Sequence, residues 1–238
     1  MQSYIEKLNE ILTLNNVCPS HGINHAIAVL NHAEKAIQAI TKEEKESIDE
    51  ETIEAIKLAA LLHDADDMKF FPANNNYQNL RTILSDKSNA FTGLVMYMVS
   101  LVSAAKNADT IPERIIDKQW LLIPRYADRL EAIGIIGIKR CYIYNTGIKA
   151  PLFTESTPRL TTDEEILSFA SEKFKSYCGC SETMIDHYYD KLIGISIFPY
   201  KNAYFDAETA IRRQPILDFV RYFGINGEID MTHLRETN

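Results

Sequence analysis

The residues with the most chemical potential lie in the segment LAALLHDADDMKFF, residues 58–71. Five apolar residues open the segment, and His63, Asp64, Asp66 and Asp67 follow them. An imidazole or a carboxylate that enters an apolar interior without a partner is costly. A divalent cation removes this cost because it converts the polar groups into ligands. The segment therefore predicts a metal site where a buried helix ends.

Two other apolar stretches offer the further ligands that such a site needs. His25 lies in SHGINHAIAVLNHA, and Asp128 lies in PRYADRLEAIG. His63 and Asp64 are adjacent and point about 100° apart on an ideal helix, so both reach one ion only if the helix ends there. We expect one divalent ion, with water in its remaining positions, held by His25, His63, Asp64 and Asp128. Two imidazoles and two carboxylates suit Mn, Mg, Co, Ni, Fe or Zn.

Other polar residues of these stretches and of the C-terminal part receive no ligand role. We expect Asp66 to be solvated. His21 and His32 are expected on the surface or beside the ligands. His187 is expected to pack or to form a hydrogen bond.

Helical periodicity dominates the elements that must position these residues. In the second expected helix, Ser20 is the predicted N-cap, and an apolar stripe runs from Ala26 to Ile37. No alternating strand pattern or repeat is visible, so the predicted fold class is all-α, in a single domain over 1–238. The expected helices are 2–14, 20–40, 49–64, 88–106, 161–176, 181–193 and 203–223.

Three stretches between these helices have a character of their own. Residues 41–51 are expected to form a solvated, charged connector. Residues 120–144 form a long apolar segment, in which 130–138 reads as a buried helix. Residues 145–160 contain glycine and prolines and predict an irregular loop.

The composition bounds the class of protein. The 238 residues are 46% hydrophobic and 24% charged, which is typical of a globular chain, and the net charge is −8. No nucleic-acid partner is expected, because binding of that kind needs a basic face. The longest apolar stretch, GLVMYMVSLVSAA, is too short to span a bilayer, and charges interrupt the apolar pattern of the N-terminus. We expect a cytoplasmic protein without membrane association.

The four cysteines form no recognisable disulfide framework. Cys18 and Cys141 stand alone, whereas Cys178 and Cys180 flank a single glycine. The pair is a weak hint of metal binding or redox chemistry. The favoured interpretation is that all four are reduced and incidental.

The order of the candidate ligands, His25, His63-Asp64 and Asp128, resembles the HD-domain metal-dependent phosphohydrolases. The chain is most similar to a bacterial branch of predicted HD hydrolases, some of which are nucleotide pyrophosphohydrolases. LLHDADDMK and YADRLEAIGIIGI match that branch, and DHYYDKL and AIRRQPILDFVRYF are similar to its C-terminal helices. The resemblance covers about residues 20–224. It implies one HD domain with additional C-terminal helices and one metal ion.

The resemblance also implies a reaction. A nucleoside triphosphate is hydrolysed to monophosphate and pyrophosphate by a metal-activated water. Asp67 is the candidate catalytic residue that orients this water or takes its proton, and it lies on the face of His63 if the helix continues that far; an exposed carboxylate is the alternative. Lys69 and Arg129 are the candidate phosphate contacts, although Arg129 has Asp128 and Glu131 as alternative partners.

Two departures from the branch keep other functions open. The branch has an acidic residue where this chain has Gly22 and an arginine where it has Ala28. A nucleotidase or a cyclic-nucleotide phosphodiesterase would use the same ligands, and a noncatalytic nucleotide-sensing module would need only binding. The base, the sugar, the metal and the oligomeric state are not encoded in any recognisable motif.

Overall fold

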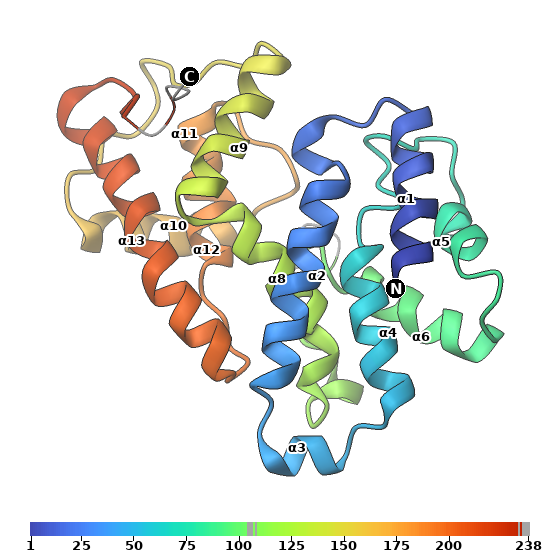
Figure 1. Ribbon diagram of the computed structural model, residues 1–238. Coiled ribbons are helices and arrows are strands. Elements are labelled where there is room, and N and C mark those ends of the chain that lie inside the picture. The colour runs from blue at the N-terminus through green and yellow to red at the C-terminus, as the bar shows by residue number, and fades with distance from the viewer. Residues whose placement is uncertain (104–106, 108, 233, 235–238) are drawn as a thin grey trace. The chain divides into compact units, whose positions relative to one another are not determined.

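Helices make up all the regular structure of the part of the chain that the computed structural model describes, which is residues 1–103, 107, 109–232 and 234 (Figure 1). The predicted all-α class is confirmed. No helix among these residues is both long enough and apolar enough to cross a membrane. The chain divides into two compact units, and the single domain over 1–238 stays a prediction. Unit 1 comprises Met1–Ser103, Ile111–Asp128 and Asn202–Tyr204, and unit 2 comprises Ala104–Thr110, Arg129–Lys201 and Phe205–Asn238.

Unit 1 contains most of the N-terminal helices, and the final helices of the chain belong mainly to unit 2. The elements of unit 1 are α1 (Gln2–Leu14), the 3-10 helix η1 (Pro19–His21), α2 (Ile23–Gln38), α3 (Lys42–Glu46), α4 (Glu50–Leu61), α5 (Gln78–Ile83), α6 (Asn89–Ser100), η2 (Glu113–Ile115), η3 (Gln119–Leu122) and the first part of α8 (Ile123–Ala132). The elements of unit 2 are the end of α8, α9 (Gly134–Gly147), α10 (Asp163–Lys175), α11 (Met184–His187), the π-helical turn η4 (Tyr188–Leu192), α12 (Ile193–Ile195) and most of α13 (Ala203–Asn226).

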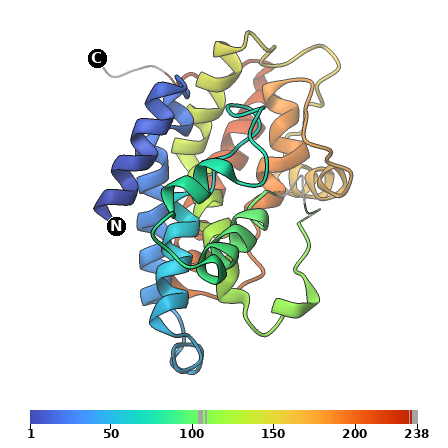
Figure 2. The same ribbon diagram turned by 90° about the vertical axis from the view of Figure 1, so that its right-hand side faces the viewer.

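The core of unit 1 forms between helices that present apolar stripes. Helix α2 packs against α4 and α1, and α4 also packs against α6 (Figures 1 and 2). The stripe of α2 from Ala26 to Ile37 is buried as predicted. Nearly every residue of α4 from Ala55 to Leu62 is buried as well. This packing stabilises the helices and holds their ends in fixed positions within unit 1.

The start of α2 differs from the prediction, and Ser20 is not its N-cap. Pro19 begins a separate 3-10 turn, which the bond from Gly22 N–H to the Pro19 carbonyl closes at 3.2 Å. Gly22 is the N-cap of α2. The hydroxyl of Ser20 instead lies 2.9 Å from His21 Nδ1, so it is not directed at the first turn of the helix.

The charged connector at 41–51 is largely exposed, as expected, but it is not irregular. Its first half forms α3. The Thr41 hydroxyl accepts the N–H of Glu44, and the Glu44 carboxylate accepts the N–H of Thr41. This reciprocal capping box stabilises a helix too short to persist by propensity alone.

Helix α5, which begins at Gln78, was not predicted, and the carboxylate of Asp66 accepts N–H groups of its first turn. The Asp66 carboxylate accepts the backbone N–H groups of Asn79 at 2.8 Å and Leu80 at 3.0 Å, and the Asn74 amide at 2.7 Å. These N–H groups have no partner inside the helix. The expectation that Asp66 is solvated is therefore wrong, because it caps a helix from a distant part of the sequence.

The apolar segment at 120–144 is not one helix. Helix α8 ends at Ala132, Ile133 is extended, and Gly134 has a φ of +73° that starts α9. A side chain at Gly134 would be strained at this φ and would meet Arg212 Cβ at 3.1 Å. The buried helix predicted over 130–138 is consequently interrupted at this glycine.

The remaining predicted helices are confirmed with shifted ends. Of the helix predicted at 88–106, α6 accounts for the part up to Ser100, and 104–106 lie outside the described residues. The helix predicted at 161–176 is α10, and the one at 203–223 is α13. The helix predicted at 181–193 is a composite of α11, the π-helical turn η4 and the start of α12.

Candidate metal centre

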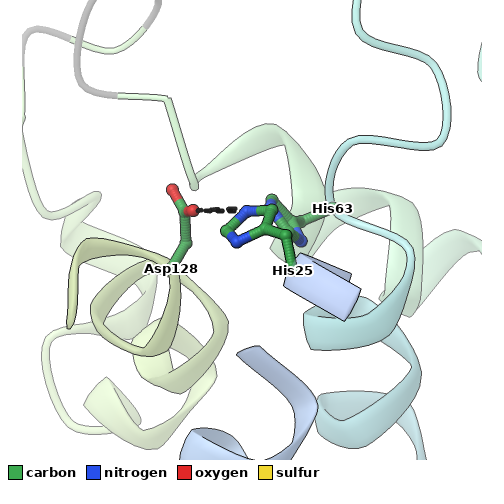
Figure 3. Close-up of side chains that lie close together, drawn as sticks. All are labelled: His25, His63 and Asp128. Atoms are coloured by element: carbon green, nitrogen blue, oxygen red, sulfur yellow. Dashed lines mark hydrogen bonds and ion pairs between the residues drawn. The ribbon is translucent and has the colours of Figure 1, made fainter. Parts of the chain in front are cut away.

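Three side chains from separate parts of the chain converge in unit 1 (Figure 3). His25 lies in the first turn of α2, His63 follows the end of α4, and Asp128 lies in α8. The Nε2 atoms of the two histidines are 3.2 Å apart, and Asp128 Oδ1 is 3.4 Å from each of them. These three atoms all lie within 4.8 Å of one another. The structure thus brings together three of the four predicted ligands.

Asp64, the fourth predicted ligand, flanks this group. Its Oδ2 lies 3.3 Å from His63 Nε2 and 3.9 Å from His25 Nε2. The side chain of Asp64 is 25% exposed and that of Asp128 is 29% exposed, whereas those of His25 and His63 are 4% and 1% exposed. The imidazoles therefore form the buried side of the centre, and the carboxylates reach the solvent.

The end of α4 positions His63. The last carbonyls of a helix have no N–H partner within it. His63 Nδ1 lies 2.8 Å from one of them, the carbonyl of Ala60. Because a carbonyl only accepts, Nδ1 carries a proton, and Nε2 is the ring nitrogen left to bind an ion. The bond thus pairs a carbonyl of the last turn and orients the ligand atom, and α4 ends at Leu61 rather than at the predicted Asp64.

Asp128 is positioned by α8, a helix that is buried on nearly all sides. Arg125 is only 1% exposed, and its Nε donates to the Leu101 carbonyl at 2.6 Å. Tyr126 and Ala127 are buried as well. This anchoring fixes the rotation of α8 about its axis, and the rotation sets the direction in which Asp128 projects.

The charges of the centre stabilise one another. Burial lowers the pKa of His63, but the carboxylates of Asp64 and Asp128 outweigh burial and hold this pKa well above its ordinary value. Burial raises the pKa of each carboxyl, yet the adjacent imidazoles bring both values below the ordinary range. Protons and a cation would compete for the same atoms.

The donor set fits a divalent metal ion. Two ligand atoms at about 2.1 Å from one ion are separated by about 3.0 Å at an octahedral angle and about 3.4 Å at a tetrahedral angle. The observed separations among His25 Nε2, His63 Nε2 and Asp128 Oδ1, 3.2–3.4 Å, fall in this range. Two imidazole nitrogens with carboxylate oxygens match Mn, Fe, Co, Ni or Zn, and with more water Mg. The cluster could therefore hold a divalent ion.

Asp67 and Lys69 lie in the turns that follow the centre. The helix does not continue to Asp67, so the condition under which Asp67 would share a helical face with His63 is not met. The Asp67 N–H donates to the Asp64 carbonyl at 3.1 Å, and Asp67 Oδ1 accepts the Lys69 N–H at 3.0 Å. Lys69 is exposed. The roles of Asp67 in catalysis and of Lys69 in substrate binding stay predictions.

Arg129 is engaged within unit 2. Its side chain is 3% exposed, and both of its terminal nitrogens donate to the carboxylate of Asp109. Asp109 was not predicted as a partner of Arg129. Glu131, one of the predicted alternative partners, has its Oε1 3.7 Å from Arg212 Nη1. Substrate contact by Arg129 stays a prediction, and a substrate phosphate would have to compete with this carboxylate.

The other histidines separate into distinct environments. His21 is half-buried beside the centre, with its ring centroid 6.2 Å from that of His25 and 5.2 Å from that of Phe70. His32 is buried about 10 Å further along α2. Its Nδ1 lies 2.6 Å from the Tyr204 hydroxyl. The expectation that His32 lies on the surface or beside the ligands is therefore wrong.

His187 forms the expected hydrogen bond. Its Nδ1 lies 3.2 Å from the hydroxyl of Ser181, and its ring lies against that of Tyr177. His187 belongs to unit 2, as do both contacts. It thus has the packing role that the sequence predicted.

Comparison with known proteins places these observations in a family. No family model matches the chain. Uncharacterized protein L803 of Acanthamoeba polyphaga mimivirus is 39% identical over 236 residues, which cover 91% of this chain and 93% of the viral protein.

Solved structures of bacterial proteins share the fold along nearly the whole chain. A Lactobacillus plantarum protein has a TM-score of 0.69 at 20% identity and covers 95% of each chain. A Listeria innocua protein has a TM-score of 0.53 at 20% identity, covering 92% of this chain and 94% of its own. An HD-superfamily hydrolase from Bacillus thuringiensis has a TM-score of 0.58 at 18% identity and covers 93% of each chain. The chain thus belongs to the family of the mimivirus protein L803 and has the HD-domain fold.

Proposed function

We propose that the chain is a metal-dependent phosphohydrolase that converts nucleoside triphosphates to monophosphates and pyrophosphate. The observation that carries this proposal is the convergence of His25, His63 and Asp128, with Asp64 beside them, in an HD-domain fold. The similar Bacillus thuringiensis protein is an HD-superfamily hydrolase, which supports the reaction class.

The chain's own residues would prepare the centre for a phosphate ester or anhydride. A divalent cation bound there supplies Lewis acidity, which lowers the pKa of a water and offsets charge on a phosphoryl group. His25 and His63 hold the buried side, and the Ala60 carbonyl keeps His63 in the required tautomer. Asp64 and Asp128 face the solvent side, from which a substrate must approach.

Asp67 is our candidate proton acceptor. Its N–H donates to the carbonyl of Asp64, three residues earlier in the chain, and this bond holds Asp67 beside the centre. Its carboxylate is partly exposed. Lys69 follows in the next turn with an exposed ammonium group suited to a phosphate oxygen. We assign the phosphate contact to Lys69 ahead of Arg129, because the guanidinium of Arg129 already pairs with Asp109.

The test is an activity matrix of divalent metals against nucleotides. Purified protein is incubated with each of Mn, Mg, Co, Ni, Fe and Zn and with nucleoside triphosphates, monophosphates and cyclic monophosphates. Pyrophosphate release supports the proposal. Release of inorganic phosphate, or ring opening of a cyclic nucleotide, would identify a nucleotidase or a phosphodiesterase instead. Nucleotide affinity without turnover in any metal would indicate a sensing module.

Three variants locate the chemistry. Asp64→Ala should lose both metal and activity. Asp67→Ala should keep the metal and lower kcat by about 100-fold or more, the contribution typical of a general base. Asp117→Ala, which removes an exposed carboxylate of unit 1, is the matched control and should behave as the wild type. Wild-type kcat in Asp67→Ala would remove Asp67 from the mechanism.

A further inference from the structure

A second group of reactive side chains lies in unit 2, in the segment between α10 and α11. Cys178 and Cys180 are both exposed, and their Sγ atoms are 3.8 Å apart. Gly179 between them has a φ of +106°, a conformation that L side chains rarely adopt. The two thiols thus face each other across a backbone turn that glycine permits.

The separation is short enough for a covalent bond to form. A disulfide requires about 2.05 Å between its sulfur atoms, so the two must approach by about 1.8 Å. Both side chains are exposed, so core packing does not block rotation about their Cα–Cβ bonds. Exposure also gives a small oxidant access to either sulfur.

A metal site is less well supported at this pair. A structural zinc ion takes four ligands. Among the residues that the structure describes, the two sulfurs belong to no cluster of three His, Cys, Asp or Glu ligands of the kind that His25, His63 and Asp128 form.

We propose that Cys178 and Cys180 form a reversible dithiol–disulfide pair that exchanges with small disulfides of the glutathione class. The thiolate of one cysteine attacks the small disulfide, forms a mixed disulfide and releases one small thiolate. The second cysteine gives its proton to solvent and attacks the protein sulfur of that mixed disulfide, which releases the second small thiolate. Two protein thiols are oxidised, one small disulfide is reduced, and the two protons go to the released thiolates.

Either cysteine can make the first attack, because both are exposed and either sulfur can donate the hydrogen bond between them.

The first experiment identifies the product. The full chain is equilibrated with oxidised and reduced glutathione, quenched with acid and mapped by mass spectrometry. A peptide that has lost two hydrogen atoms between Cys178 and Cys180 is the expected product. Cys180→Ser should instead accumulate a glutathione adduct on Cys178, and Cys178→Ser should accumulate one on Cys180. Adducts on both cysteines of the wild-type chain, without the internal bond, would overturn the proposal.

The second experiment uses stoichiometry and requires no variant. An internal disulfide releases two molecules of reduced glutathione for each oxidised one consumed, whereas an adduct releases one. At constant oxidised glutathione, doubling the reduced form should therefore lower the ratio of oxidised to reduced pair roughly fourfold. A roughly twofold change contradicts an internal bond. Protection of both thiols by added Zn²⁺ at equimolar concentration would show a metal site and would also overturn the proposal.

Discussion

Replacement of Asp66 separates a carboxylate that supports the fold from the neighbouring carboxylate that we assign to chemistry. Asp66 and Asp67 are adjacent and look alike in the sequence. In the structure Asp66 accepts bonds from Asn74, Asn79 and Leu80, whereas Asp67 Oδ1 accepts one local bond from Lys69. Asp66→Ala should therefore lower stability, and Asp67→Ala should not.

The contacts set the magnitude. Loss of a helix N-cap costs about 0.5–2 kcal/mol, and a hydrogen bond to a charged group contributes about 1.5–3 kcal/mol. The Asp66 site is only partly buried and its three bonds are not additive, so we expect a loss of about 2–3 kcal/mol in Asp66→Ala. Asp66→Asn keeps one acceptor oxygen, so its stability should lie between that of the wild type and that of Asp66→Ala. Asp67→Ala should cost less than about 0.5 kcal/mol.

The assay is urea unfolding of the three variants and the wild type, followed by circular dichroism, together with thermal unfolding. At this chain length the expected loss in Asp66→Ala corresponds to a fall in Tm of about 4–12 °C. Metal binding by folded Asp66→Ala should be retained, because its carboxylate lies outside the cluster. Equal losses for Asp66→Ala and Asp67→Ala would refute the assignment of the cap.

Further predictions concern other parts of the chain. Asp109→Ala removes the carboxylate partner of the buried Arg129 and should lower the free energy of unfolding by about 3 kcal/mol, measured by urea unfolding; a loss below about 1 kcal/mol would show that the pair is not a structural one. Burial raises the pKa of Cys141 to about 12. Its alkylation by iodoacetamide should therefore rise roughly tenfold per pH unit up to pH ~10, as followed by peptide mapping, and a plateau near pH 8 would contradict the shift. Gly134→Ala should destabilise unit 2 by about 1–3 kcal/mol, because the residue has a positive φ and faces Arg212; an unchanged Tm would be inconsistent with that geometry.

The helices and the ligand cluster could be predicted because their signals are local. A stripe such as Ala26 to Ile37 identifies a buried face, and a polar residue that interrupts an apolar stretch identifies a candidate ligand. His25, His63 and Asp128 were found in this way, and the structure brings them together. The charged segment that begins at Thr41 also carried a local signal, since a threonine followed three residues later by glutamate is a capping box.

The interactions that the sequence did not reveal join residues that are far apart in the chain. Asp66 caps a helix 13 and 14 residues away, and Arg129 pairs with Asp109, 20 residues before it. Partners at such separations depend on how the elements pack, which periodicity does not specify. The shared face of His63 and Asp67 does not form for a related reason. It required a longer α4, whereas α4 ends at Leu61.

The most direct test of the central claim is a titration of the metal-free protein with Mn²⁺, with free Mn²⁺ measured by electron paramagnetic resonance. We predict one strongly bound ion per chain in the wild type. His63→Gln should lose this binding, and the matched control His187→Gln, which changes a histidine of unit 2, should retain it. Strong binding that survives in His63→Gln and in Asp128→Asn would contradict a metal centre at these residues.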